Sequence, residues 1–148
     1  MIILFRKVMC GIANALRYFK ILHLKTGGVK VGNNTMISLG AKIDTHKGKI
    51  VIGDNCLITH GAKILSHDGA LRLISPGAER GGSVAIGNNV FVGVNAIILK
   101  DVTVGDNSVI AAGAVVVKDV PTGVVVAGNP AKVIRILKGP FPILNSPG

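Results

Sequence analysis

The stretch IGNNVFVGVNAIILKDVTV, residues 86–104, decides the fold of this chain. A branched aliphatic residue returns in it every six positions, at Ile86, Val92, Ile98 and Val104. The residue four positions after each of the first three is small or β-branched, namely Val90, Ala96 and Val102. A period of six fits neither the turn of an α-helix nor the alternation of a single long strand. It indicates a short strand followed by a corner, repeated many times.

The same pattern continues on both sides of this stretch. The aliphatic series also contains Val31, Ile37, Ile43, Ile52, Ile58, Ile64, Ile110 and Val116. The small or β-branched series also contains Thr35, Ala41, Cys56, Ala62, Ser108, Ala114 and Val120. Three six-residue faces close one triangular coil, and stacked coils bury a continuous core. A composition with 49% hydrophobic but only 3% aromatic residues agrees with many thin, similar layers.

A short sequence motif, Gly-x-Asn, recurs at the corners of these coils. Gly-x-Asn begins at Gly32, Gly53, Gly87 and Gly105. We expect glycine there because it permits backbone angles that a side chain forbids. The last two glycines are 18 residues apart, which is one coil of three sixes. Gly32 and Gly53 are 21 residues apart, so three residues beyond one coil are expected within 45–49. Gly53 and Gly87 are 34 residues apart, which predicts a loop of 16 extra residues after Ile64.

The repeats, together with the closing segment AGNPAKVIR at 127–135, resemble the hexapeptide-repeat acyltransferases. The resemblance covers residues 31–135 and is greatest to the galactoside, maltose and polysaccharide O-acetyltransferases. It implies an all-β solenoid, a left-handed parallel β-helix of about four to five triangular coils. It also implies assembly as a homotrimer and acetyl-CoA as the co-substrate.

The flanks of the β-helix are predicted to differ from it. Residues 1–25 are expected to form an amphipathic helix, because apolar residues recur there at spacings of three and four. This helix is expected to cover the open end of the solenoid or to pack on a neighbouring subunit, with peripheral attachment to a membrane as the alternative. The β-helix is expected over 29–136 with its loop at 68–84, and the Pro- and Gly-rich residues 137–148 as an irregular tail.

The formal charge of +10 predicts an anionic partner. Aromatic residues interleaved with the basic ones are missing, so nucleic acid is not expected to be that partner. Cys10 and Cys56 lie far apart without metal-ligand spacing, and no signal peptide or membrane span is recognisable. These features favour a cytoplasmic protein, with the inner face of the membrane as a second possible location.

Acetyl transfer to a hydroxyl requires a base that takes the hydroxyl proton, and histidine suits this role near neutral pH. His67 follows Ile64 by three residues, where the loop leaves the coil. The resemblance implies the catalytic histidine at this place, so we expect His67 to be the general base. His23 and His60 are expected to be structural or solvated. No nucleophilic motif accompanies His67, which favours direct transfer over an acyl-enzyme.

Other residues are expected to surround His67. His46 lies 21 residues earlier, so it is expected on the same corner one layer away, touching the acceptor or bordering the site. A catalytic imidazole usually needs an acceptor on its other nitrogen, for which Asp68, Glu79, Asp101 or a backbone carbonyl are the candidates. Phe91 stands where relatives often carry Trp. We expect His46, Asp68, Glu79 and Phe91 to line the acceptor site.

For acetyl-CoA, the resemblance implies a groove between neighbouring barrels near the C-terminal coils. The positions that match in this sequence are Gly93, Val94, Ala112, Val117, Lys118, Lys132 and Arg135. Three of them are basic and are expected to contact phosphates. Val94 and Val117 replace side chains that can form hydrogen bonds, so only backbone contacts are expected from them.

The loop at 70–83, which contains Arg72, Glu79 and Arg80, is expected to select the acceptor. Its basic residues favour an acidic or phosphorylated sugar, and we expect O-acetylation of a surface polysaccharide or its precursor. An N-acetyltransferase acting on an amino-sugar nucleotide is the first alternative. A non-catalytic scaffold and a zinc enzyme resembling the γ-carbonic anhydrases are the others. Since histidines five apart are missing, no metal is expected.

Overall fold

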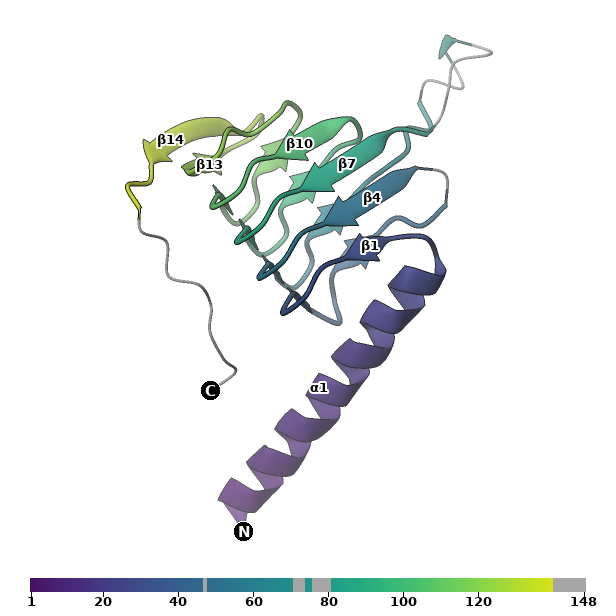
Figure 1. Ribbon diagram of the computed structural model, residues 1–148, viewed down its shortest axis with the longest axis vertical. Coiled ribbons are helices and arrows are strands. Elements are labelled where there is room, and N and C mark those ends of the chain that lie inside the picture. The colour runs from purple at the N-terminus through teal and green to yellow at the C-terminus, as the bar shows by residue number, and fades with distance from the viewer. Residues whose placement is uncertain (47, 71–73, 76–80, 140–148) are drawn as a thin grey trace.

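The computed structural model of the chain describes residues 1–46, 48–70, 74–75 and 81–139. It begins with one long helix, α1 (Ile2–Thr26), and continues in short strands that wind into a triangular solenoid (Figure 1). The tail beyond residue 139 and most of the loop expected at 68–84, with Arg72, Glu79 and Arg80, lie outside the described residues.

The strands form three sheets, one on each face of the solenoid. The first, sheet A, contains β1 (Lys30–Val31), β4 (Lys49–Ile52), β7 (Ser83–Ile86) and β10 (Val102–Val104). Sheet B contains β2 (Met36–Ile37), β5 (Leu57–Ile58), β8 (Phe91–Val92), β11 (Val109–Ile110), β13 (Val124–Ala127) and β14 (Lys132–Ile136). Sheet C contains β3 (Lys42–Ile43), β6 (Lys63–Ile64), β9 (Ile97–Ile98) and β12 (Val115–Val116).

Successive coils pair in parallel at the spacings that the corner glycines predict. In sheet A, Val31 pairs with Ile52, Ile52 with Ile86, and Ile86 with Val104. The described part of the chain completes four coils and begins a fifth, in which Val120 forms a bridge with Val104. The expected left-handed β-helix of four to five coils is confirmed.

The six-residue period also predicts which residues form the core. All ten members of the small or β-branched series are buried. Of the twelve aliphatic members, eleven are buried and Ile43 packs partly buried against the others. Each coil therefore contributes one large and one small inward residue per face, and the burial of this column of branched side chains is the main source of stability.

The corners differ from the sequence expectation in one respect. The residue in the left-handed region is the third of each Gly-x-Asn word, with φ of 51° at Asn34 and 55° at Asn55. Asparagine tolerates this conformation better than other residues with side chains. The glycine is required for a different reason, since a Cβ on Gly32 would lie 2.6 Å from the carbonyl carbon of Gly53 in the next coil. Close stacking of coils, rather than an unusual backbone angle, excludes a side chain there.

The two ends of the solenoid are closed differently. At the C-terminal end, β14 turns back and pairs antiparallel with β13, so the last parallel strand is not left open. At the N-terminal end, only the last turns of α1 contact the first coil, where Leu24 is buried and Ile21 partly buried. The periodic apolar residues of the helix, among them Ile12, Leu16 and Phe19, stay exposed, so they do not provide the expected covering of this end. The rest of α1 projects away from the coils (Figure 1).

Candidate active site

The candidate site lies on the edge where sheet C turns toward sheet A. After β3 the chain places Asp44 and His46 on this edge, and after β6 it places Ser66 and His67 one coil further on. The register of β3 on β6 pairs Ile43 with Ile64, so the two segments start level. Strand pairing thus brings together residues that are more than 20 positions apart in sequence.

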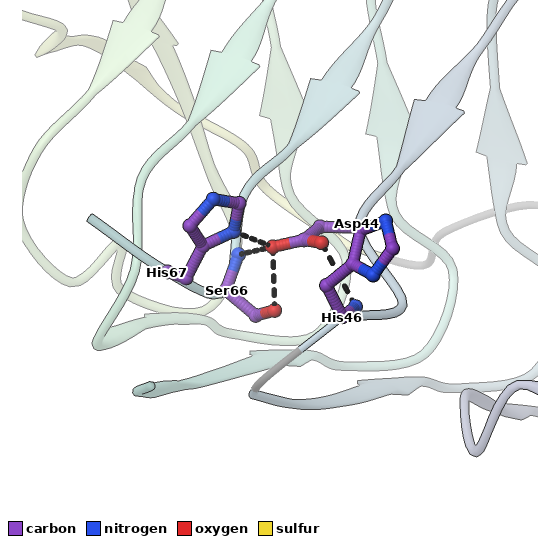
Figure 2. Close-up of polar contacts among 4 residues, drawn as sticks. All are labelled: Asp44, His46, Ser66 and His67. Atoms are coloured by element: carbon purple, nitrogen blue, oxygen red, sulfur yellow. Dashed lines mark hydrogen bonds and ion pairs between the residues drawn. The ribbon is translucent and has the colours of Figure 1, made fainter. Parts of the chain in front are cut away.

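Asp44 is the centre of this group (Figure 2). Its Oδ2 accepts hydrogen bonds from the backbone amide of Ser66 at 3.2 Å and from Ser66 Oγ at 2.9 Å. The same oxygen contacts Nδ1 of His67. Its Oδ1 accepts the amide of His46 at 3.0 Å. The side chain of Asp44 is only 6% exposed, so these donors replace the water that a carboxylate would otherwise bind.

The donors also fix the charge of Asp44. Burial by itself would raise the pKa of this carboxyl group, but the hydrogen bonds from His67, the His46 amide and Ser66 together lower the pKa to about 2. Asp44 is therefore an anion at neutral pH. A carboxylate at Nδ1 keeps a proton on that nitrogen and leaves Nε2 as the basic atom of the ring.

The position of His67 gives this basic nitrogen access to other molecules. Its side chain is 41% exposed, and its ring nitrogen away from Asp44 points out of the cluster (Figure 2). The backbone of His67 forms an antiparallel bridge with Gly81, and the Gly82 amide donates to the Ser66 carbonyl at 2.7 Å. The loop therefore leaves and rejoins the solenoid beside the imidazole.

The other predicted neighbours of His67 fall in different places. His46 is exposed in the same cluster, as the offset of 21 predicts (Figure 2). Asp68 accepts the amide of Ala70 at 2.8 Å through Oδ1, which forms a local turn at the start of the loop. Asp101 accepts the Ser83 amide at 3.0 Å and lies 3.7 Å from Lys100 Nζ, so it does not orient His67. Glu79 is outside the described residues.

Sequence reasoning missed Asp44 as the acid that holds the imidazole. It considered acids only at or after His67, whereas Asp44 lies 23 residues before it. The offset of 21 residues that places His46 beside His67 also places Asp44 level with Leu65. Applied backward along the chain, the same offset would have added Asp44 to the candidate acids, although it does not give the direction of the side chain.

The residues predicted to contact acetyl-CoA occupy two edges and one end of the solenoid. Val117 and Lys118 follow β12 on the same edge as His67, two coils further on. Gly93, Val94 and Ala112 lie on the edge between sheets B and C. Lys132 and Arg135 are exposed on β14. Within the described residues, none of the three basic side chains has an ion-pair partner.

Two further predictions can be placed. Phe91 is 37% exposed on β8 in the middle of sheet B, so a single chain does not bring it next to His67. A Cβ on Gly93 would lie 2.5 Å from the amide nitrogen of Ala112, so its lack of a side chain is already explained by the next coil. Across 1–46, 48–70, 74–75 and 81–139, no group of three or more His, Cys, Asp or Glu residues could hold a metal ion.

Comparison with known proteins places this arrangement in context. Residues 83–118 match the family model described as bacterial transferase hexapeptide (six repeats). Protein CapG of Staphylococcus aureus is 42% identical over 137 residues, which are 90% of this chain and 69% of CapG.

Two solved structures show the same likeness in three dimensions. The polySia-specific acetyltransferase NeuO superposes with a TM-score of 0.67 and 33% identity, over 80% of this chain and 57% of that enzyme. A galactoside acetyltransferase in complex with coenzyme A gives 0.64 and 37%, over 75% of this chain and 56% of that one. The chain thus spans less than two thirds of the length of each of these two enzymes.

Proposed function

The chain belongs to the hexapeptide-repeat acyltransferases, and from this premise we propose that it transfers the acetyl group of acetyl-CoA to a sugar hydroxyl with His67 as general base. The observation that carries the proposal is the contact between Asp44 and His67 Nδ1 at the base of the loop. A buried carboxylate, an exposed imidazole and an adjacent loop together meet the needs of acyl transfer to a bound hydroxyl.

The chemistry assigned to His67 is a proton transfer in two directions. Nε2 accepts the proton of the acceptor hydroxyl as its oxygen attacks the thioester carbonyl, and the imidazole becomes an imidazolium ion. When the carbon–sulfur bond breaks, the same proton moves from Nε2 to the departing thiolate. No proton is gained or lost overall, and no covalent bond to the protein forms. This agrees with a site in which no Ser or Cys motif accompanies His67.

Asp44 acts through His67 rather than on the substrate. It is already an anion, so it stabilises the imidazolium ion without taking up the proton itself. The bonds from Ser66 and the His46 amide keep the carboxylate in place while the charge on the ring changes. Asp44 is therefore a positioning residue, and Ser66 supports it.

The positions of the basic residues on the C-terminal coils agree with the proposed binding of acetyl-CoA. Coils are about 4.8 Å apart, so Lys118 lies on the His67 edge roughly 10 Å further on. Lys118, Lys132 and Arg135 are all exposed and free of ion pairs within the described residues, as phosphate contacts require. With the thioester at His67, the phosphates of acetyl-CoA would extend toward these cations.

A homotrimer would complete this binding site. Gly93, Val94 and Ala112 lie on a different edge from His67 and Lys118, with sheet C between them. In a groove between two barrels, the edge of one chain would face the other edge of its neighbour. The proposed trimer thus accounts for predicted contacts that one chain keeps apart, including Phe91.

The acceptor class rests on the relatives and on the loop. The two solved relatives are named for a galactoside and for polySia. The loop beside His67 contains Arg72 and Arg80, which favour an acidic sugar. We therefore propose a sugar of a surface polysaccharide, or its precursor, as the acceptor.

The experiment is a thiol-release assay with acetyl-CoA against a panel of neutral, acidic and nucleotide-linked sugars. With the best acceptor, His67→Ala should lower kcat by about 10²- to 10⁴-fold. His23→Ala is the matched control, because the His23 side chain is exposed on α1 and belongs to no contact of the site in the described part of the chain; it should leave kcat unchanged. Equal thiol release by wild type and His67→Ala would refute the assignment of the base.

The position of the acetyl group decides between the proposal and its first alternative. An ester on a hydroxyl is removed by mild alkali, whereas an amide on an amino sugar survives it. Mass spectrometry of the product before and after alkali therefore separates O-acetylation from N-acetylation. We expect an alkali-labile product.

A further inference from the structure

We propose that α1 binds the surface of an anionic lipid bilayer through an exposed apolar face. The inference is independent of acetyl transfer, because it rests on the helix and not on the His67 site. It assigns a partner to the one long element of the described chain that the proposed reaction does not use.

The apolar face is formed by residues that recur every three or four positions along α1. Val8, Ile12, Leu16 and Phe19 are 51%, 49%, 49% and 63% exposed. Met9 and Leu22 flank them and are about as exposed. A row of large apolar side chains along three turns is unusual on a surface that faces only water.

Residues outside this apolar face hold the helix against the solenoid. Leu24 is buried there, and Lys20 Nζ donates to the carbonyl groups of Ser38, Leu39 and Ala41 at 2.6 to 2.8 Å. Burial lowers the pKa of Lys20. These contacts fix the rotation of α1 about its axis, so that the apolar face points away from the first coil. The helix then projects beyond the coil (Figure 1).

Charge selects the partner of this helix. Residues 1–43 contain no Asp or Glu, and their basic residues are Arg6, Lys7, Arg17, Lys20, Lys25, Lys30 and Lys42. Two such helices packed together would bring like charges close without a compensating acid, which disfavours packing of α1 on the α1 of a second copy. A bilayer with anionic lipids attracts every one of these cations while it takes up the apolar side chains.

The helix would lie in the plane of the membrane surface. No helix in the described ranges is long and apolar enough to cross a bilayer. An amphipathic helix with basic residues beside its apolar face instead enters the boundary between headgroups and acyl chains. The solenoid would then be held close to the bilayer by α1 alone.

The test is flotation of the full chain with phosphatidylcholine vesicles, with and without phosphatidylglycerol. Wild type should float with the anionic vesicles, remain unbound with the neutral ones, and be released by added salt. Phe19→Glu should weaken partitioning by about tenfold or more, because it places a charge where an aromatic ring would be buried.

Ile74→Glu is the matched control. Ile74 is 75% exposed on the loop, and this substitution makes the same change in charge at an apolar residue that is at least as exposed as Phe19. It should leave flotation unchanged. Circular dichroism should show that both variants keep the fold, since neither side chain belongs to the core.

Three results would overturn the proposal. The first is wild type that does not float with anionic vesicles. The second is an equal loss of flotation in Phe19→Glu and Ile74→Glu. The third is that neither wild type nor Phe19→Glu binds vesicles, while sedimentation velocity shows that Phe19→Glu forms a smaller oligomer than wild type. That result would identify another copy of the chain as the partner of the apolar face.

Discussion

The edge between sheets C and A is built in two ways along the solenoid. After β9 and β12, Asp101 and Asp119 each accept one backbone amide of the preceding coil, Ser83 N at 3.0 Å and Thr103 N at 2.7 Å. After β3 and β6, the level positions are held by His46 and His67. The acid is instead two residues earlier, at Asp44.

The two arrangements place their acids in different surroundings. The side chain of Asp101 is 60% exposed and that of Asp44 is 6% exposed. An exposed acid that caps one amide needs little else, because water completes its hydrogen bonds. A nearly buried acid needs several donors, and Asp44 has four, from His67, Ser66 and His46.

This difference separates what the fold needs from what the site needs. The pattern of inward-facing residues repeats in all coils, so packing of the core does not depend on the arrangement around Asp44. The C-terminal coils show that one capping Asp is enough to build this edge. The N-terminal coils use more polar groups there, and what these groups hold is an exposed imidazole.

The largest loss of activity should come from Asp44→Asn. The amide has almost the same shape, but it carries no charge to stabilise an imidazolium ion and only one oxygen to accept from Ser66, His46 and His67. We expect kcat to fall by about 10²- to 10⁴-fold, with KM for acetyl-CoA nearly unchanged. Steady-state thiol release measures both. A kcat within twofold of wild type would show that His67 does not depend on this carboxylate.

A second prediction concerns the stability of the fold at low pH. The pKa of Asp44 is about 2 in the folded protein, below its usual value of 3.8. Because the unfolded chain takes up this proton first, the contribution of Asp44 to stability is complete above about pH 4 and is lost as the pH falls toward 2. The free energy of unfolding, measured in urea at about pH 5 and about pH 3, should therefore fall more for wild type than for Asp44→Asn. An equal fall would mean that another group causes the acid sensitivity.

Most of the fold could be predicted from the sequence because it repeats. A period of six and the glycine spacings of 21, 34 and 18 determined the strands, the register and the place of the loop. The core followed from the same period, with Ile43 as the one aliphatic member that stays partly exposed. Only the reason for the corner glycines was wrong, since close stacking cannot be read from one strand.

The site could be predicted less completely because it breaks the repeat. His67 stands out by its place before the loop, and His46 by its offset. The role of Asp44 depends on the direction in which its side chain turns, which no spacing gives. The apolar residues of α1 have the same limitation, since their period predicts a helix face without saying whether the first coil covers it.

The smallest effect, and the sharpest control, should come from Asp101→Ala. This substitution removes one exposed hydrogen bond to the Ser83 amide and a weak pair with Lys100, and it places alanine at a left-handed backbone position with φ of 62°. The free energy of unfolding should fall by about 1–2 kcal/mol, and kcat should stay unchanged. Urea unfolding and thiol release measure the two quantities. If Asp101→Ala lowered kcat as much as Asp44→Asn, Asp101 would contribute to catalysis as well as to the structure of this edge. The contrast between a structural acid at Asp101 and a positioning acid at Asp44 would then be wrong.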